Sequence, residues 1–119
     1  MSIKIEHLNY IYSPGTAYER QALKDICLEL PHGEFVGIIG HTGSGKSTLL
    51  HILGSVDKPS EGKVWVDGVD ISAMNPTQSA IFRRRKVGLV YQFYNLIPTL
   101  TIRKNILMPL MLDKKEPNR

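Results

Sequence analysis

The sequence predicts an α/β fold in which a glycine-rich loop joins a buried strand to a helix. Residues 40–47, Gly-His-Thr-Gly-Ser-Gly-Lys-Ser, fit the phosphate-loop pattern G-x-x-x-x-G-K-[ST]. Apolar residues fill 35–39 before the loop and dominate 49–53 after it, as expected for a strand and then a helix. A second apolar run at 87–91 predicts another buried strand, because parallel strands covered on both faces lack polar alternation.

Several loop residues suit a role in holding a polyphosphate. Gly43 and Gly45 lack a Cβ, so the backbone can turn successive N–H groups toward an anion. Lys46 supplies a mobile ammonium, Ser47 a hydroxyl suited to Mg²⁺, and Thr48 a hydroxyl and an N–H at the positive end of the helix. A strand–helix turn that binds nothing is the alternative. The predicted nucleotide-binding residues of this segment are Gly40, His41, Thr42, Gly43, Ser44, Gly45, Lys46, Ser47 and Thr48.

Composition indicates one small globular unit. The chain has 119 residues, of which 42% are hydrophobic, and this supports one core rather than two domains. The net charge of +4 is concentrated at Arg83, Arg84, Arg85 and Lys86, at the end of an expected helix. Because cations favour a helix C-terminus, we expect a solvated helix end there and no nucleic-acid partner.

The lone cysteine and the hydropathy pattern limit the setting of the chain. Cys27 cannot form a disulfide within one chain, so a reduced, cytoplasmic setting is expected, and no catalytic role is predicted for it. No stretch approaches the roughly 20 apolar residues of a membrane span. Any pore is therefore expected on another chain.

Alternation of apolar residues predicts three strands outside the loop region. Residues 3–12 change phase near His7, which indicates a bulge or break. A second strand over residues 23–30 is expected to place Ile26, Leu28 and Leu30 inside. Residues 63–68 are expected to form a half-exposed strand followed by a turn.

Capping residues predict where the helices begin and end. The helix after the loop should stop at Gly54, and Asn75 followed by Pro76 should open a helix that runs to the basic residues. Thr101 is expected to cap a last helix whose residues Ile102, Ile106 and Leu110 share an apolar face. Residues 113–119 are expected to form a polar tail.

Four segments occur in a fixed order: the loop, Ser60-Glu61-Gly62, Val66-Asp67-Gly68 and the run 87–92. Together they resemble the ATP-binding subunits of ABC transporters. The resemblance covers nearly the whole chain, 1–119, and corresponds to roughly the first half of such a nucleotide-binding domain. It implies a P-loop NTPase core, here incomplete, with an N-terminal antiparallel β subdomain. It also implies ATP and Mg²⁺ as cofactors, and ATP binding and hydrolysis coupled to transmembrane transport.

The same resemblance implies two further site residues. Tyr12 matches the aromatic residue that stacks on adenine in this family, with Tyr10 second; ordinary packing at a strand end is the alternative. Gln92 matches the glutamine that senses Mg²⁺ and the γ-phosphate, so Ser47 and Gln92 are the expected metal-binding residues. The alternative for Gln92 is a polar residue that ends a buried strand.

The resemblance further implies protein partners. Residues 93–101 resemble the segment that docks on membrane-spanning transporter subunits, with local core packing as the alternative. A second nucleotide-binding subunit is expected as well, and a peripheral location at the inner face of the cell membrane. Residues 82–85 and 95–98 resemble the corresponding segments of exporters of lipoproteins, macrolides and antimicrobial peptides. We favour this export type. Residues 12–16 with His41 and Thr42 look more like energy-coupling-factor importers.

The family's signature sequence, Asp-Glu strand and switch histidine do not occur in this sequence. No residue is placed to activate water, so we do not expect hydrolysis by this chain alone. Some apolar surface should remain exposed, and we expect marginal stability, self-association or a truncated reading frame. Alternative functions are a non-catalytic nucleotide-binding fragment and a small P-loop kinase, which would need an arginine lid that Arg83, Arg84 and Arg85 are poorly placed to form.

Overall fold

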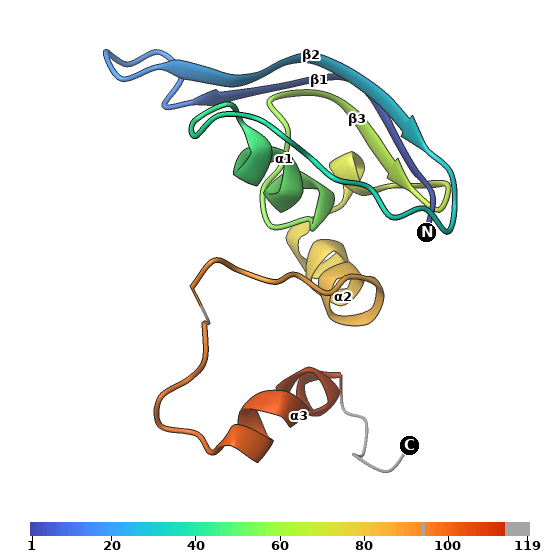
Figure 1. The fold of residues 1–119 in the computed structure, drawn as a ribbon, viewed down its shortest axis with the longest axis vertical. Coiled ribbons are helices and arrows are strands. Elements are labelled where there is room, and N and C mark those ends of the chain that lie inside the picture. The colour runs from blue at the N-terminus through green and yellow to red at the C-terminus, as the bar shows by residue number, and fades with distance from the viewer. Residues whose placement is uncertain (94, 114–119) are drawn as a thin grey trace.

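The computed structural model describes residues 1–93 and 95–113. The strands form one antiparallel sheet in the order β2-β1-β3-β4, which confirms the predicted N-terminal antiparallel unit. Figure 1 shows α1 beneath this sheet, with α2 and then α3 farther from it. The elements in chain order are β1 (Ile3–Tyr12), β2 (Arg20–Leu30), α1 (Lys46–Leu53), β3 (Glu61–Val66), β4 (Val69–Asp70), the 3₁₀ helix η1 (Ile71–Ala73), α2 (Pro76–Lys86) and α3 (Ile102–Leu112).

The core lies between the sheet and the helices next to it. Leu8 of β1 and Val64 of β3 are fully buried, and Ile52 of α1 and Phe82 of α2 pack into the same cluster. The helix that follows the glycine-rich loop is therefore anchored to the sheet by its own apolar side. The buried apolar residues are Ile5, Leu8, Leu23, Ile52, Val64, Val66, Ile71 and Phe82.

The strand predictions hold for β1 and in part for β2. The bulge in β1 is confirmed, because the register shifts between Ile5 and Leu8 and His7 has a φ of +48°. Leu28 was predicted to face inward, but 38% of it is exposed. Leu28 is the register partner of the buried Ile5, so it lies on the core side of the sheet as predicted, but β2 is an edge strand and leaves Leu28 incompletely covered.

The two predicted buried parallel strands are not formed. Residues 35–39 and 87–91 lie outside every strand, and Ile39 and Val90 are 98% and 96% exposed. A parallel strand needs hydrogen-bonded neighbours and cover on both faces. The described residues supply neither, because all four of their strands belong to the antiparallel sheet. The expectation that apolar surface remains exposed is confirmed.

The helix boundaries follow the predicted caps. α1 ends before Gly54, whose N–H donates to the Leu50 carbonyl at 2.9 Å. Asn75 and Gln78 form a reciprocal capping box at the start of α2, with hydrogen bonds of 2.8 and 3.1 Å. The Thr101 hydroxyl accepts the Lys104 N–H at 3.1 Å and begins α3. The helix is confirmed, but Ile102 and Ile106 of its apolar face are exposed.

The basic end of α2 is more than a solvated helix end. The Nε atoms of Arg84 and Arg85 donate to Asp113 Oδ1 at 2.9 and 2.8 Å, and the Asp113 side chain is nearly buried. These contacts link α2 to the residue that follows α3. Hydrogen bonds from Arg85, and then from Arg84, lower the pKa of Asp113 against the opposing effect of burial. The rest of the predicted polar tail, 114–119, lies outside the described residues.

This depressed pKa predicts a pH-dependent attachment of α3. A carboxylate with a lowered folded-state pKa stabilises above its unfolded pKa of about 3.9, and the stabilisation is lost as pH falls through the folded value. We expect hydrogen-exchange protection of α3, corrected for intrinsic rates, to persist from about pH 7 to about pH 5 and to fall below about pH 4. Asp113→Asn should lower protection already at neutral pH. Asp67→Asn, the same charge change in the β3–β4 turn, should not, and protection of α3 that is independent of both pH and Asp113 would contradict the expectation.

Candidate nucleotide-phosphate site

The predicted loop passes closely beneath β2 before it enters α1. Gly43 and Gly45 have φ values of +83° and +100°, in the left-handed region that glycine tolerates. A Cβ added to Gly45 would stand 2.6 Å from the Ala22 carbonyl oxygen. Gly45 is therefore required both by its φ and by the close approach to β2.

The N-terminus of α1 differs from the N-termini of α2 and α3 because no side chain of the described residues caps it. The first N–H groups of an α-helix have no partner within the helix, and the helix dipole places partial positive charge beside them. In α1 these groups belong to Lys46, Ser47 and Thr48. The end of the loop therefore offers donors to an anion.

Two cationic side chains contact the loop itself. The Lys46 ammonium donates to the Gly40 carbonyl and lies 3.4 Å from the carbonyl oxygen of His41. The Arg20 guanidinium, from the first residue of β2, donates to the Gly43 carbonyl. The ion pairs found within residues 1–93 and 95–113 include neither cation. The site therefore carries positive charge without a carboxylate bound to it.

Tyr12 joins the end of β1 to the first turn of α1. Its hydroxyl lies 2.6 Å from Oγ1 of Thr48, which is 5% exposed. Its ring meets Tyr10 edge-on, with 4.8 Å between ring centroids. Burial is the main cause that raises the pKa of Tyr10, followed by the charge of Asp57. The Tyr12 side chain is thus held by contacts with Thr48 and Tyr10, and the residue remains 40% exposed.

One pocket of about 540 Å³ gathers residues that are far apart in sequence. Gln92 lies on its wall together with Tyr12 and residues 42, 43 and 45–47 of the loop. Gly40, His41 and Ser44 are not on the wall; the first two present carbonyls to Lys46, and the Ser44 N–H donates to the His41 carbonyl at 3.0 Å. Among the described residues, those lining the pocket are Tyr12, Arg20, Ala22, Thr42, Gly43, Gly45, Lys46, Ser47, Thr48 and Gln92, with no carboxylate.

Sequence reasoning missed Arg20 as part of this pocket. The signal that could have found it is strand pairing, because Arg20 of β2 is the register partner of Tyr12 in β1. The arginines considered as a lid lie elsewhere. Arg83 donates to the Ser55 carbonyl at 2.6 Å, and its two neighbours donate to Asp113, so none of them lines the pocket.

The predicted docking segment keeps apolar side chains in solvent. Phe93 and Leu96 are well exposed, and Tyr94 lies outside the described residues. The Asn105 side chain of α3 holds the backbone of Ile97, accepting its N–H at 2.8 Å and donating to its carbonyl at 3.2 Å. The segment is therefore fastened through its backbone while its side chains stay available. No helix within the described ranges is long and apolar enough to cross a membrane.

Comparisons with known proteins identify a family. The ABC transporter family matches residues 23–119. An ABC transporter ATP-binding protein of Bacillus subtilis, YvcR, is 48% identical over 87% of this chain and 40% of its own length. The lipoprotein-releasing system ATP-binding protein LolD of Bordetella pertussis is 42% identical over 99% of this chain and 51% of its own length. The chain thus spans about half the length of these relatives.

Solved structures agree in fold. The dimeric ATP-binding cassette MJ0796, in a post-hydrolysis state bound to ADP and Pi, superposes with a TM-score of 0.86 at 40% identity. The alignment covers 92% of this chain and 47% of that one. A second dimeric structure of MJ0796, described as a bacterial ABC transporter cassette, gives a TM-score of 0.88 at 39% identity. The fold is therefore that of a P-loop NTPase of this family, in part.

Proposed function

This chain belongs to the ABC transporter family of ATP-binding proteins, and we propose that it binds MgATP in the pocket at the N-terminus of α1. ATP binding coupled to transport is the general function of the family. The observation that supports the proposal is one pocket that gathers most of the glycine loop, two cations, Tyr12 and Gln92.

The donor set fits a nucleotide polyphosphate. The uncapped N–H groups at the start of α1 and the two glycines with positive φ suit phosphate oxygens. Lys46 would hold the β- and γ-phosphates, and Arg20 would add a second cation on the β2 side. Ser47 and Gln92 supply the oxygen ligands that Mg²⁺ prefers, and the bound ion would neutralise phosphate charge. Because no carboxylate lines the pocket within the described residues, the proposal is limited to binding.

Adenine would stack on the ring of Tyr12, a residue that is 40% exposed. The ring is held by the Tyr12–Thr48 hydrogen bond and by Tyr10, so little side-chain freedom would be lost when a base stacks on it. The base would then lie at the end of β1 and the phosphates at the start of α1. The Tyr12–Thr48 hydrogen bond would also be expected of a tyrosine with a structural role alone. Variants of Tyr12 distinguish adenine stacking from that structural role.

A protein of this family would act together with partner subunits. We assign the exposed Phe93, Leu96 and Ile97 to contact with membrane-spanning subunits, which would hold the protein at the inner face of the cell membrane. A second nucleotide-binding subunit is also proposed, by analogy with the dimeric MJ0796 structures. The similarity to LolD, a component of a lipoprotein-releasing system, favours export.

Isothermal titration calorimetry tests the proposed binding. We expect one-site heats for MgATP and MgADP and none for AMP, because AMP lacks the β- and γ-phosphates that the loop and Lys46 would hold. Chelation of Mg²⁺ should weaken ATP binding. Absence of heat with both MgATP and MgADP, in protein whose circular dichroism spectrum shows a folded chain, would refute the proposal.

Variants of Tyr12 in the same titration test the adenine contact. Tyr12→Ala should weaken MgATP binding roughly 5- to 100-fold, the range expected for loss of one base–aromatic stack. Tyr12→Phe keeps the ring and removes the hydroxyl that meets Thr48, so binding should stay near wild type. Tyr18→Ala, at an exposed tyrosine outside the pocket, is the matched control. Equal losses in Tyr12→Phe and Tyr12→Ala would assign the effect to the hydroxyl rather than to stacking.

A further inference from the structure

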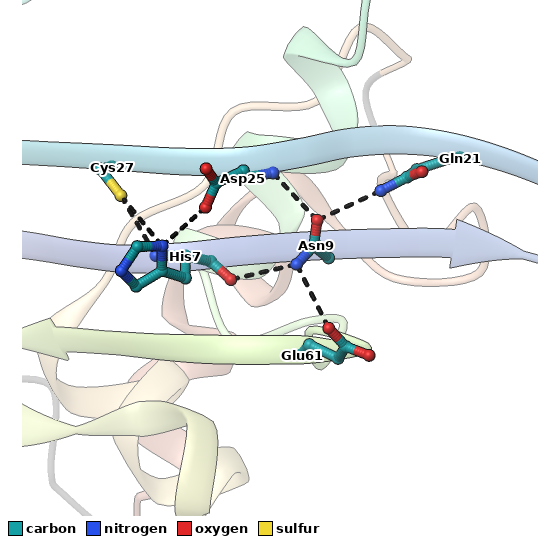
Figure 2. A network of polar contacts seen from close by, with 6 residues as sticks. All are labelled: His7, Asn9, Gln21, Asp25, Cys27 and Glu61. Carbon is teal, nitrogen blue, oxygen red and sulfur yellow. Dashed lines mark hydrogen bonds and ion pairs between the residues drawn. The ribbon is translucent and has the colours of Figure 1, made fainter.

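A cluster of three potential metal ligands lies on the exposed surface of the sheet, at β1 and β2. Figure 2 shows the side chains of His7, Asp25 and Cys27 directed toward one another. His7 Nδ1 is 2.7 Å from Asp25 Oδ1 and 3.8 Å from Cys27 Sγ, and the three ligand atoms all lie within 4.8 Å of one another. None of the three lines the nucleotide pocket.

Strand geometry explains why these side chains meet. Asp25 and Cys27 are two positions apart in β2, and Figure 2 shows both side chains on the side of the strand that His7 approaches. His7 reaches them from β1 at the bulge, where the register shifts between the pairs Ile5–Leu28 and Leu8–Ile26. The His7 N–H also donates to Cys27 Sγ at 3.3 Å. The bulge therefore brings an imidazole to a carboxylate and a thiol.

The donor set and its spacing match a borderline-soft divalent cation. Zn²⁺ binds imidazole nitrogen, carboxylate oxygen and thiolate sulfur at about 2.0 to 2.3 Å, so ligand atoms in a tetrahedron are roughly 3.3 to 3.6 Å apart. The His7–Asp25 and His7–Cys27 separations bracket this range. Ca²⁺ and Mg²⁺ prefer all-oxygen sites and do not suit a set that contains a thiol.

A surrounding hydrogen-bond network holds the backbone of two of the ligand residues. The Asn9 side chain accepts the Asp25 N–H at 2.9 Å and donates to the His7 carbonyl at 3.3 Å. Asn9 Oδ1 also accepts a hydrogen bond from Gln21 Nε2 at 3.2 Å, and Asn9 Nδ2 donates to Glu61 Oε2 at 3.4 Å (Figure 2). Outer contacts of this kind orient metal ligands and reduce the loss of freedom on binding. Asn9 is thus a positioning residue that joins β1, β2 and β3 around the cluster.

From this arrangement we propose that His7, Asp25 and Cys27 form a three-ligand site for Zn²⁺ or a similar transition metal. The cation takes the place of the His7–Asp25 hydrogen bond, and small rotations of exposed side chains complete the three protein bonds. Water fills the fourth position. The site is separate from the Mg²⁺ expected in the nucleotide pocket, and it does not depend on nucleotide.

Cobalt substitution tests this site in the full chain, because Co²⁺ replaces Zn²⁺ and gives absorption bands that report thiolate ligation and tetrahedral geometry. We expect one equivalent of Co²⁺ to produce a sulfur-to-cobalt charge-transfer band without nucleotide, in wild type and in Lys46→Ala alike. Excess Mg²⁺ should not remove the band, and one equivalent of Zn²⁺ should. Absence of the band in wild type would overturn the proposal.

Variants then identify the ligands. Cys27→Ser should abolish the charge-transfer band, and His7→Gln and Asp25→Asn should each weaken Co²⁺ binding at least tenfold. Asn9→Ala should weaken it less while keeping the band, as a positioning role requires. His32→Gln is the matched control, because His32 is exposed and contacts the N-terminal amine instead of the cluster. All three ligand side chains are exposed, so these changes spare the core, and wild-type binding by His7→Gln and Asp25→Asn would refute the assignment.

Discussion

Replacing Lys46 with alanine is expected to weaken MgATP binding by at least 10- to 100-fold while leaving the chain folded. Hydrogen bonds to charged groups contribute about 1.5 to 3 kcal/mol each, and the variant also removes a positive charge that faces the phosphates. Among the described residues the Lys46 ammonium donates hydrogen bonds only to loop carbonyls, and Lys46 is the first residue of α1, where alanine favours the helix. Calorimetry with MgATP, together with a thermal melt, separates the two effects.

Two further lysine variants make this test specific. Lys63→Ala makes the same charge change at an exposed position of β3 and should leave the affinity near wild type. Lys46→Arg keeps the charge but replaces a compact ammonium by a planar guanidinium. If the position of the charge matters, this variant should bind MgATP more tightly than Lys46→Ala but more weakly than wild type. Unchanged MgATP affinity in a folded Lys46→Ala variant would contradict the assigned role.

The features that the sequence predicts well are those encoded locally. Helices α2 and α3 begin after Asn75 and Thr101, and α1 ends before Gly54, each through a hydrogen bond to a residue within four positions. Neighbours in sequence therefore suffice to predict these boundaries. The glycine loop is likewise contiguous. The bulge near His7 shows as a change of phase within one strand. In each case the signal lies within one short segment of the sequence.

The failures concern contacts between distant segments. Residues 35–39 and 87–91 have the composition of buried strands, but burial depends on neighbours that the described residues do not provide. Arg20 enters the pocket only through the pairing of β1 with β2. The His7–Cys27 contact spans 20 positions and depends on a bulge whose exact place alternation cannot fix. Tyr12 and Gln92 entered the predicted site through family resemblance, and their roles stay predictions.

Gly62→Ala is expected to destabilise the sheet by about 3 kcal/mol or more, because both backbone conformation and space are wrong for a side chain. Gly62 has a φ of +95°, and a Cβ there would stand 2.3 Å from the His7 carbonyl oxygen and 2.7 Å from that of Glu6. Both atoms belong to the backbone of β1, so relief requires β1 and β3 to separate. The urea unfolding midpoint measures the loss.

Gly68→Ala separates the two causes. Gly68 has a φ of +78°, but no atom of the described residues lies within 4 Å of an added Cβ, so only the left-handed conformation is penalised, by about 1 to 2 kcal/mol. Gly62→Ala should therefore cost clearly more than Gly68→Ala, and equal costs would show that β1 yields without strain. Because Gly62 faces the bulge that carries His7, a folded Gly62→Ala chain should also bind Co²⁺ more weakly, while Gly68→Ala should bind it normally. Backbone packing between β1 and β3 would then control the geometry of the proposed metal site.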